Sequence, residues 1–128
     1  MEKKQKMLNN SRSLLVSEPG PLCSGLHAVL NAISDVTTVP LKQGTSATLD
    51  AVSSHRPALL LMNPNSSTEN VCEIVKQVKR RSPKTNCVVL TKRMQNRSII
   101  EAAGADKVLL KGTNAAQLVN VLEGMLAQ

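Results

Sequence analysis

The sequence contains no Phe, Tyr or Trp among its 128 residues. Aromatic side chains normally supply large blocks of buried area, so the core must be built from Leu, Val, Ile, Ala and Met. The absence of flat rings also argues against a protein that binds single-stranded nucleic acid by stacking bases on aromatic side chains. With 41% hydrophobic residues the chain can still form the core of one ordinary domain.

Long apolar runs are missing as well. No run reaches 18 apolar residues, so no transmembrane helix is expected. The basic start, MEKKQKMLNNSRS, leads into no apolar segment of the signal-peptide type, and residues 1–10 are predicted to form a disordered basic tail. The few cysteines, Cys23, Cys72 and Cys87, lie in apolar patterns without metal-ligand spacing, which predicts buried free thiols in a reducing cytoplasm.

Acidic residues are absent from positions 74 to 100, although the chain has nine of them. Half of the sixteen basic residues fall in this interval and form what we call the 76–97 basic patch: Lys76, Lys79, Arg80, Arg81, Lys84, Lys92, Arg93 and Arg97. Such a patch attracts nucleic acid or an acidic protein surface, within a chain of net charge +7. Because no base-reading motif accompanies the charge, a solvated helix face is the favoured interpretation.

Strand and helix patterns alternate from residue 11 onward. Short apolar runs predict strands at 13–16, 36–41, 59–62, 87–90 and 108–110. Periodic apolar stripes predict five intervening or following helices, and alternation of this kind indicates βαβ units with a parallel sheet. The strands are continuous apolar runs, which is typical of a sheet that is covered on both faces.

Local signals mark the ends of the predicted helices. Pro21 suits a first helical turn, and the buried face of that helix is predicted to hold Leu22, Leu26, Val29, Leu30 and Ile33. Ser66 and Glu69 have the spacing of a capping box. Gly104 is expected to close the short helix around 99–103, and either Thr113 or Asn114 to cap the last helix.

Ligands of open parallel sheets bind beyond the carboxyl ends of the strands. The side chains at or just after those ends are therefore the candidates for any chemistry: Ser17, Glu18, Asn63, Thr91 and Lys111.

Two segments add to the pattern of these strand ends: GLHAVLNAISDV (25–36) and AAGADKVLLKGT (102–113). Together with the strand ends they make the chain resemble the receiver domain of two-component response regulators, in particular those of the NarL/LuxR type. The resemblance covers residues 11–127 and implies a flavodoxin-like (βα)5 domain. Its α/β architecture is a doubly wound parallel sheet of five strands in the order 2-1-3-4-5. In that family strand 1 ends in two acids, strand 3 in the aspartate that accepts phosphate, and strand 4 in Thr or Ser, and a lysine follows strand 5.

The match to the family's active site is partial. Thr91 and Lys111 agree with it, whereas Ser17 stands at the position of the first acid and only Glu18 supplies an acid there. Asn63 stands at the position of the acceptor aspartate, and Val108 at the position of the aromatic switch residue. The resemblance thus implies an atypical receiver, or pseudo-receiver, that lacks its phospho-acceptor.

An amide at position 63 changes the chemistry that is possible. A carboxamide is far less nucleophilic than a carboxylate and forms no stable acyl phosphate, and Pro64 lacks the backbone N–H through which Asn63 would deamidate. Mg²⁺ needs oxygen ligands with negative charge, so we expect no cofactor and weak or absent Mg²⁺ binding. Lys111 is expected to contact Glu18, while Asn63 and Thr91 complete a neutral hydrogen-bond network.

Three functions stay open. The favoured one is a protein-interaction module, not an enzyme, that acts in signal transduction and transcription regulation without phosphorylation. It binds a protein partner or a second copy through the face formed by Met94–Ala103, Lys107–Leu110 and Asn114–Ala127, and reaches DNA only through an output domain that this chain does not contain. The alternative is nucleic-acid or polyanion binding by the 76–97 basic patch, which would weaken steeply with salt.

The third reading is residual enzyme-like or small-ligand function in the strand-end pocket. It is the least favoured, because His27 and His55 have no nucleophile beside them in the sequence. No Gly-rich phosphate-binding fingerprint is present either.

Overall fold

The computed structural model describes residues 12–40, 44–64 and 67–126. The predicted basic tail, residues 1–10, lies outside the described residues. Within these ranges no helix is both long and apolar enough to span a bilayer.

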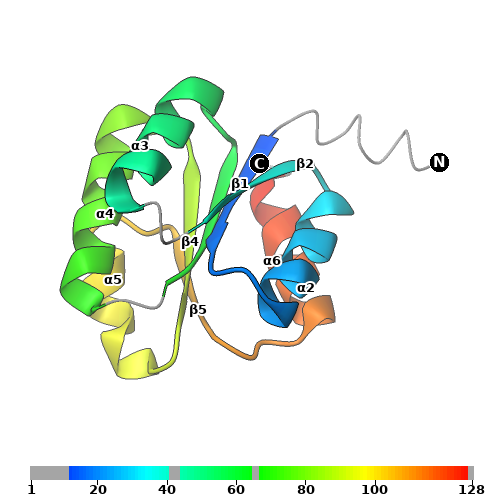
Figure 1. Ribbon diagram of the computed structural model, residues 1–128. Helices are drawn as coiled ribbons and strands as arrows, with labels where there is room; N and C mark the ends of the chain where they lie inside the picture. Colours follow the sequence, from blue (N-terminus) through cyan, green and yellow to red (C-terminus); the bar gives the residue numbers. More distant parts are fainter. Residues whose placement is uncertain (1–11, 41–43, 65–66, 127–128) are drawn as a thin grey trace.

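Five parallel strands form a single sheet in the order β2-β1-β3-β4-β5, which confirms the predicted fold class (Figure 1). The strands are β1 (Arg12–Ser17), β2 (Asp35–Pro40), β3 (Leu59–Asn63), β4 (Asn86–Thr91) and β5 (Lys107–Leu110). Each predicted strand is present, and no strand end differs from its predicted position by more than one residue. Since all strands run in one direction, their carboxyl ends share one edge of the sheet, the lower edge in Figure 1.

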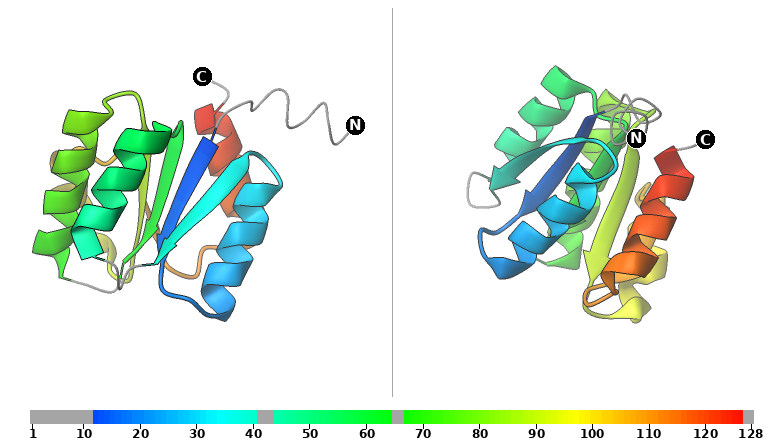
Figure 2. Two further views of the ribbon diagram at one scale, coloured as in Figure 1. Left: turned by 45° about the horizontal axis from the view of Figure 1, so that its top comes forward. Right: turned by 90° about the vertical axis from the view of Figure 1, so that its right-hand side faces the viewer.

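The helices cover both faces of the sheet. They are α2 (Pro21–Asn31), α3 (Gly44–His55), α4 (Thr68–Arg81), α5 (Arg97–Ala102) and α6 (Ala115–Leu126), and a 3-10 turn, η2 (Met94–Asn96), precedes α5. Helices α2 and α6 lie on one face and α3, α4 and α5 on the other (Figures 1 and 2).

Alternate side chains of the central strands enter two separate aliphatic cores. Leu14 and Val16 pack beneath α3, α4 and α5, whereas Leu15 packs beneath α2 and α6. Strands β1, β3 and β4 are buried over nearly their whole length. Burial on both faces explains why these strands read as continuous apolar runs in the sequence.

Helix α4 begins one residue later than its predicted capping box requires. The N-cap is Ser67, whose Oγ accepts a hydrogen bond from the backbone N–H of Asn70 at 3.2 Å. The predicted pair, Ser66 and Glu69, is thus displaced by one position, and Ser66 itself lies outside the described residues.

The predicted buried face of α2 was wrong at one residue. Leu22 is 53% exposed, because the side of the helix that meets the sheet holds Cys23, Leu26 and Leu30. At α6 the structure decides between the two predicted caps: Asn114 Oδ1 accepts from the backbone N–H of Gln117 at 2.8 Å.

Gly104 ends α5, as predicted. Its φ of +123° lies in the region that favours glycine. The backbone N–H of Gly104 donates to the carbonyl of Glu101 at 3.0 Å, and that of Ala105 to the carbonyl of Ile100 at 3.3 Å. These two bonds satisfy carbonyls at the helix end and turn the chain directly into β5.

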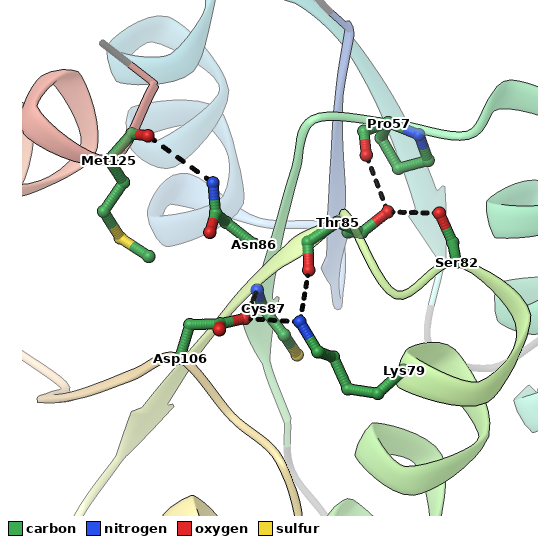
Figure 3. Close-up of polar contacts among 8 residues, drawn as sticks. All are labelled: Pro57, Lys79, Ser82, Thr85, Asn86, Cys87, Asp106 and Met125. Atoms are coloured by element: carbon green, nitrogen blue, oxygen red, sulfur yellow. Dashed lines mark hydrogen bonds and ion pairs between the residues drawn. The ribbon is translucent and has the colours of Figure 1, made fainter. Parts of the chain in front are cut away.

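A polar cluster joins α4, β4 and the loop before β5 at the edge where the strands begin (Figure 3). Asp106 Oδ2 accepts from Lys79 Nζ at 2.9 Å and from the backbone N–H of Cys87 at 2.7 Å. Lys79 Nζ also donates to the carbonyl of Thr85 at 2.9 Å, and the buried Thr85 hydroxyl donates to the carbonyl of Pro57 at 2.7 Å. This cluster, which we call the Asp106 cluster, ties α4 to the start of β4 and to the loop before β5.

The three cysteines are buried and free, as predicted. Burial raises the pKa of the Cys87 thiol to about 12, with a further increase from the Asp106 charge and an opposing effect of Lys79. A thiol of that pKa stays protonated at neutral pH and is a poor nucleophile.

Candidate functional site

The structure brings the predicted strand-end residues to one edge of the sheet. Ser17 ends β1 and lies in register with Asn63, which ends β3. Thr91 ends β4, and its carbonyl accepts from the backbone N–H of Lys111 at 2.8 Å. Glu18 follows β1 directly and is exposed. Parallel pairing alone therefore places all five candidates near each other.

Asn63 is hydrogen-bonded to Ser17 across the paired ends of β1 and β3. Its Nδ2 donates to Ser17 Oγ at 3.1 Å, and Ser17 Oγ donates to the carbonyl of Glu18 at 3.2 Å. Asn63 is only 8% exposed, and no group of the described residues donates to its Oδ1. A buried acceptor without a donor costs about 1–3 kcal/mol. The surroundings of Asn63 thus provide an acceptor for its amide nitrogen but no donor among the described residues for its amide oxygen.

Lys111 is half-buried and bonds to the backbone of the β3–α4 loop. Its Nζ donates to the carbonyl of Pro64, where the sequence predicted direct contact with Glu18. Burial lowers the pKa of Lys111, the positive charge of Lys92 lowers it further, and the negative charge of Glu18 opposes both as the smallest of the three effects. Glu18 therefore acts on this lysine as a nearby charge that does not offset the other two effects.

Thr91 does not complete the predicted network with Asn63. Its hydroxyl donates to the carbonyl of Arg93 at 3.3 Å and accepts weakly from the N–H of Arg93 at 3.4 Å. The site thus contains two short networks, one at Ser17 and one at Thr91. Val108, which the sequence analysis placed at the position of the aromatic switch residue, is buried in the core beneath α4 and α5.

A cavity of about 230 Å³ opens beside Thr91 and Lys111, between α4, β4 and α5. Its polar lining comprises Thr68, Thr91, Lys92, Arg93, Asn96 and Lys111. The sequence analysis missed Thr68 and Asn96 and placed Lys92 and Arg93 only in the basic patch. The signal that could have found the two cations is their position directly after the end of β4.

The residues of this edge do not fit Mg²⁺. Among the five candidates only Glu18 carries a carboxylate, and the amide nitrogen of Asn63 is the group that faces Ser17. Over the described ranges no group of three or more His, Cys, Asp or Glu could hold a metal ion. A hard divalent cation requires several oxygen ligands, most of them charged.

The 76–97 basic patch is divided between the two edges of the sheet. Helix α4 runs antiparallel to the strands, so Arg80 and Arg81 in its last turn lie at the edge where strands begin (Figure 1). Lys92 and Arg93 follow β4 at the opposite edge. A strand of six residues separates the two groups by roughly 20 Å.

Two further cations of the patch are held by carboxylates. Lys79 Nζ lies 2.9 Å from Asp106 Oδ2, and Arg97 Nε lies 3.1 Å from Glu101 Oε2. The continuous basic segment of the sequence is thus not one continuous basic surface.

No protein-family model and no curated protein matches the sequence. Solved structures do. One is the receiver domain of the sensor histidine kinase PA1611 from Pseudomonas aeruginosa PAO1, a structure with a magnesium ion in its active site cleft. It is 17% identical in sequence, the match covers 92% of this chain and 98% of that chain, and the TM-score is 0.77.

Two other structures show the same likeness. A LuxR-family two-component response regulator from an Aurantimonas species is 16% identical, with 91% of this chain and 85% of that chain covered and a TM-score of 0.78. The chemotaxis protein CheY4 of Vibrio cholerae is 21% identical, with 90% and 98% covered and a TM-score of 0.75. The chain therefore has the fold of response-regulator receiver domains.

Proposed function

We propose that the chain is a pseudo-receiver that works in signal transduction by binding another protein, without phosphorylation and without a metal cofactor. It is not an enzyme, and transcription regulation is the setting that its LuxR-like segments favour. The observation that carries the proposal is the buried Asn63 at the end of β3, bonded to Ser17 at 3.1 Å. Two of the three positions that would supply carboxylates in a receiver are neutral here and only Glu18 keeps one, so the nucleophile and most of the negative charge for a metal are lost together.

The α5–β5–α6 face supports binding as the remaining activity. In the part of the chain that the structure describes, four large hydrophobic side chains are exposed, and three of them lie here: Met94 (38%), Ile99 (57%) and Leu110 (43%). A groove of about 470 Å³ crosses the face and is lined by residues of η2, β5 and the start of α6. Exposed apolar side chains beside a groove are typical of a protein-binding surface.

The charge of this groove favours an acidic protein over a second copy. Its charged lining residues are Arg97, Lys107 and Lys111, and no carboxylate lines it. A two-fold dimer through the same face would place these cations against their own copies. An acidic segment with apolar side chains complements both the charge and the exposed leucine and methionine. We therefore propose an acidic protein partner at this face.

A designed acidic amphipathic helix, with Glu on one face and Leu on the other, is expected to bind the unaltered chain saturably in a fluorescence anisotropy titration. Leu110→Asp should weaken this binding at least about tenfold, because it places a carboxylate against the acidic peptide and removes an apolar contact. Leu22→Asp makes the same change at the exposed leucine of α2 and should leave the Kd within about twofold. Acetyl phosphate with Mg²⁺ should leave the affinity unchanged.

Two results would count against this proposal. Peptide binding that requires acetyl phosphate and Mg²⁺ would show that phosphorylation controls the face. A dimer that sedimentation equilibrium detects, and that Leu110→Asp disrupts while Leu22→Asp does not, would replace the acidic partner with a second copy.

A further inference from the structure

We propose that the cavity at the end of β4 is a metal-free binding site for a small phosphate-type oxyanion, held noncovalently by Lys92, Arg93 and Lys111. This site shares Lys111 with the groove of the α5–β5–α6 face proposed above, but Lys92 and Arg93 belong to the cavity alone. The ligand keeps all its bonds, so neither a nucleophile nor a metal is needed.

The polar part of the cavity lining brings together hydrogen-bond donors from three elements, and the rest of the lining is apolar. Lys92 and Arg93 follow β4, Lys111 follows β5, and Thr68 opens α4, all around a volume of about 230 Å³. The amide of Asn96 adds a neutral donor, and no carboxylate lines the cavity. A small anion is the ligand that such a set of groups complements.

Within the described residues the positive charge at this edge is only partly offset. The charge of Lys92 lowers the pKa of Lys111, as burial does, and the opposing effect of Glu18 is the smallest of the three. Two ammonium groups at a half-buried cavity destabilise each other's charged form, and an anion between them stabilises the charged form of both. Because Ser17 and Asn63 are neutral, Glu18 is the one carboxylate among the five strand-end residues, and it offsets the charge of these cations only in part.

The direction of α4 adds to the same field. The helix has 14 residues and begins at Thr68, so its positive N-terminal end lies at the cavity. Ser67 Oγ accepts a hydrogen bond from the backbone N–H of Asn70. The backbone N–H groups that precede Asn70 in the first turn have no acceptor within the helix.

The size of the cavity limits the ligand. A volume of 230 Å³ is below the roughly 300–1,000 Å³ of sites for drug-sized ligands, and a water molecule takes about 30 Å³. The site therefore suits inorganic phosphate or the phosphate group of a small phosphomonoester.

The test is a ¹H–¹⁵N NMR titration of the full chain with sodium phosphate, at an ionic strength held constant with sodium chloride. Saturable shifts are expected at the backbone amides of Thr91, Lys92 and Lys111, and Mg²⁺ should not tighten binding. Lys92→Ala with Arg93→Ala should weaken phosphate binding at least about tenfold. Arg80→Ala with Lys84→Ala removes the same charge at the far edge and should leave the Kd within about twofold.

A parallel titration with phosphoserine distinguishes phosphomonoesters from free phosphate as the ligand of this site. Tighter binding of phosphoserine than of phosphate assigns the site to phosphomonoesters, and weaker binding assigns it to the free ion. The absence of saturable shifts would overturn the proposal, and so would equal weakening by the two double variants, since general charge screening would explain it. Lys92 and Arg93 are exposed, so their removal leaves the fold intact.

Discussion

Ser17→Asp combined with Asn63→Asp is expected to bind Mg²⁺ at least about 100-fold more tightly than the unaltered chain and to accept one phosphoryl group from acetyl phosphate. Two unit charges 4 Å apart at an effective dielectric constant of 20 interact by about 4 kcal/mol, and desolvation offsets part of this. A remaining gain of about 3 kcal/mol corresponds to roughly 100-fold. With Glu18 the double variant has three acids, and Thr91 and Lys111 are already at this edge.

The single variant Asn63→Asp should regain little of either activity. It restores the nucleophile, but Ser17 in register beside it still leaves the site short of negative charge. Calorimetric titration with Mg²⁺ and intact mass after acetyl phosphate measure both quantities, and circular dichroism confirms that each variant is folded. If Asn63→Asp alone reached the level of the double variant, Ser17 would have no part in the loss of metal binding.

Asp106→Ala is expected to lower the free energy of unfolding by about 2 kcal/mol. Asp106 Oδ2 accepts from the backbone N–H of Cys87 at 2.7 Å and from Lys79 Nζ at 2.9 Å (Figure 3). Alanine leaves a backbone donor at the start of β4 without its acceptor and an ammonium group without its counter-charge. Asp106→Asn keeps an acceptor for the N–H and should lose less.

Glu101→Ala is the matched control, because it also removes a carboxylate from an ion pair. Glu101 lies one helical turn from Arg97 at an exposed surface, and its Oε2 is 3.1 Å from Arg97 Nε. Such pairs contribute only about 0.3–0.5 kcal/mol. Urea unfolding of the three variants gives the comparison. Similar small losses for Asp106→Ala and Glu101→Ala would show that the Asp106 cluster contributes no more than a surface pair.

The sheet could be predicted because burial on both faces leaves a simple mark in the sequence. Strands β1, β3 and β4 each contain a continuous apolar run, and a polar residue at the end of the strand follows each run. Parallel pairing then places strand ends together, so Ser17 and Asn63 could be assigned to one site before their 3.1 Å contact was known. Fold and site position thus follow from pattern and topology.

Two kinds of contact could not be predicted: those with backbone acceptors, and those between side chains that lie far apart in the sequence. Lys111 bonds to the carbonyl of Pro64, an acceptor that no side-chain pattern reveals, where charge alone predicted Glu18. Asp106 reaches Lys79 across 27 positions of sequence, which removes one cation from the basic patch. Two adjacent serines made the cap of α4 ambiguous by one residue, because both have the side chain that a cap needs.

The central claim is that the strand-end site of this receiver fold has neither the nucleophile nor the metal ligands for phosphorylation. Intact mass of the unaltered chain after incubation with acetyl phosphate and Mg²⁺ tests it most directly. The mass is expected to stay unchanged. A gain of one phosphoryl group that requires Mg²⁺ and maps to position 63 would contradict the account.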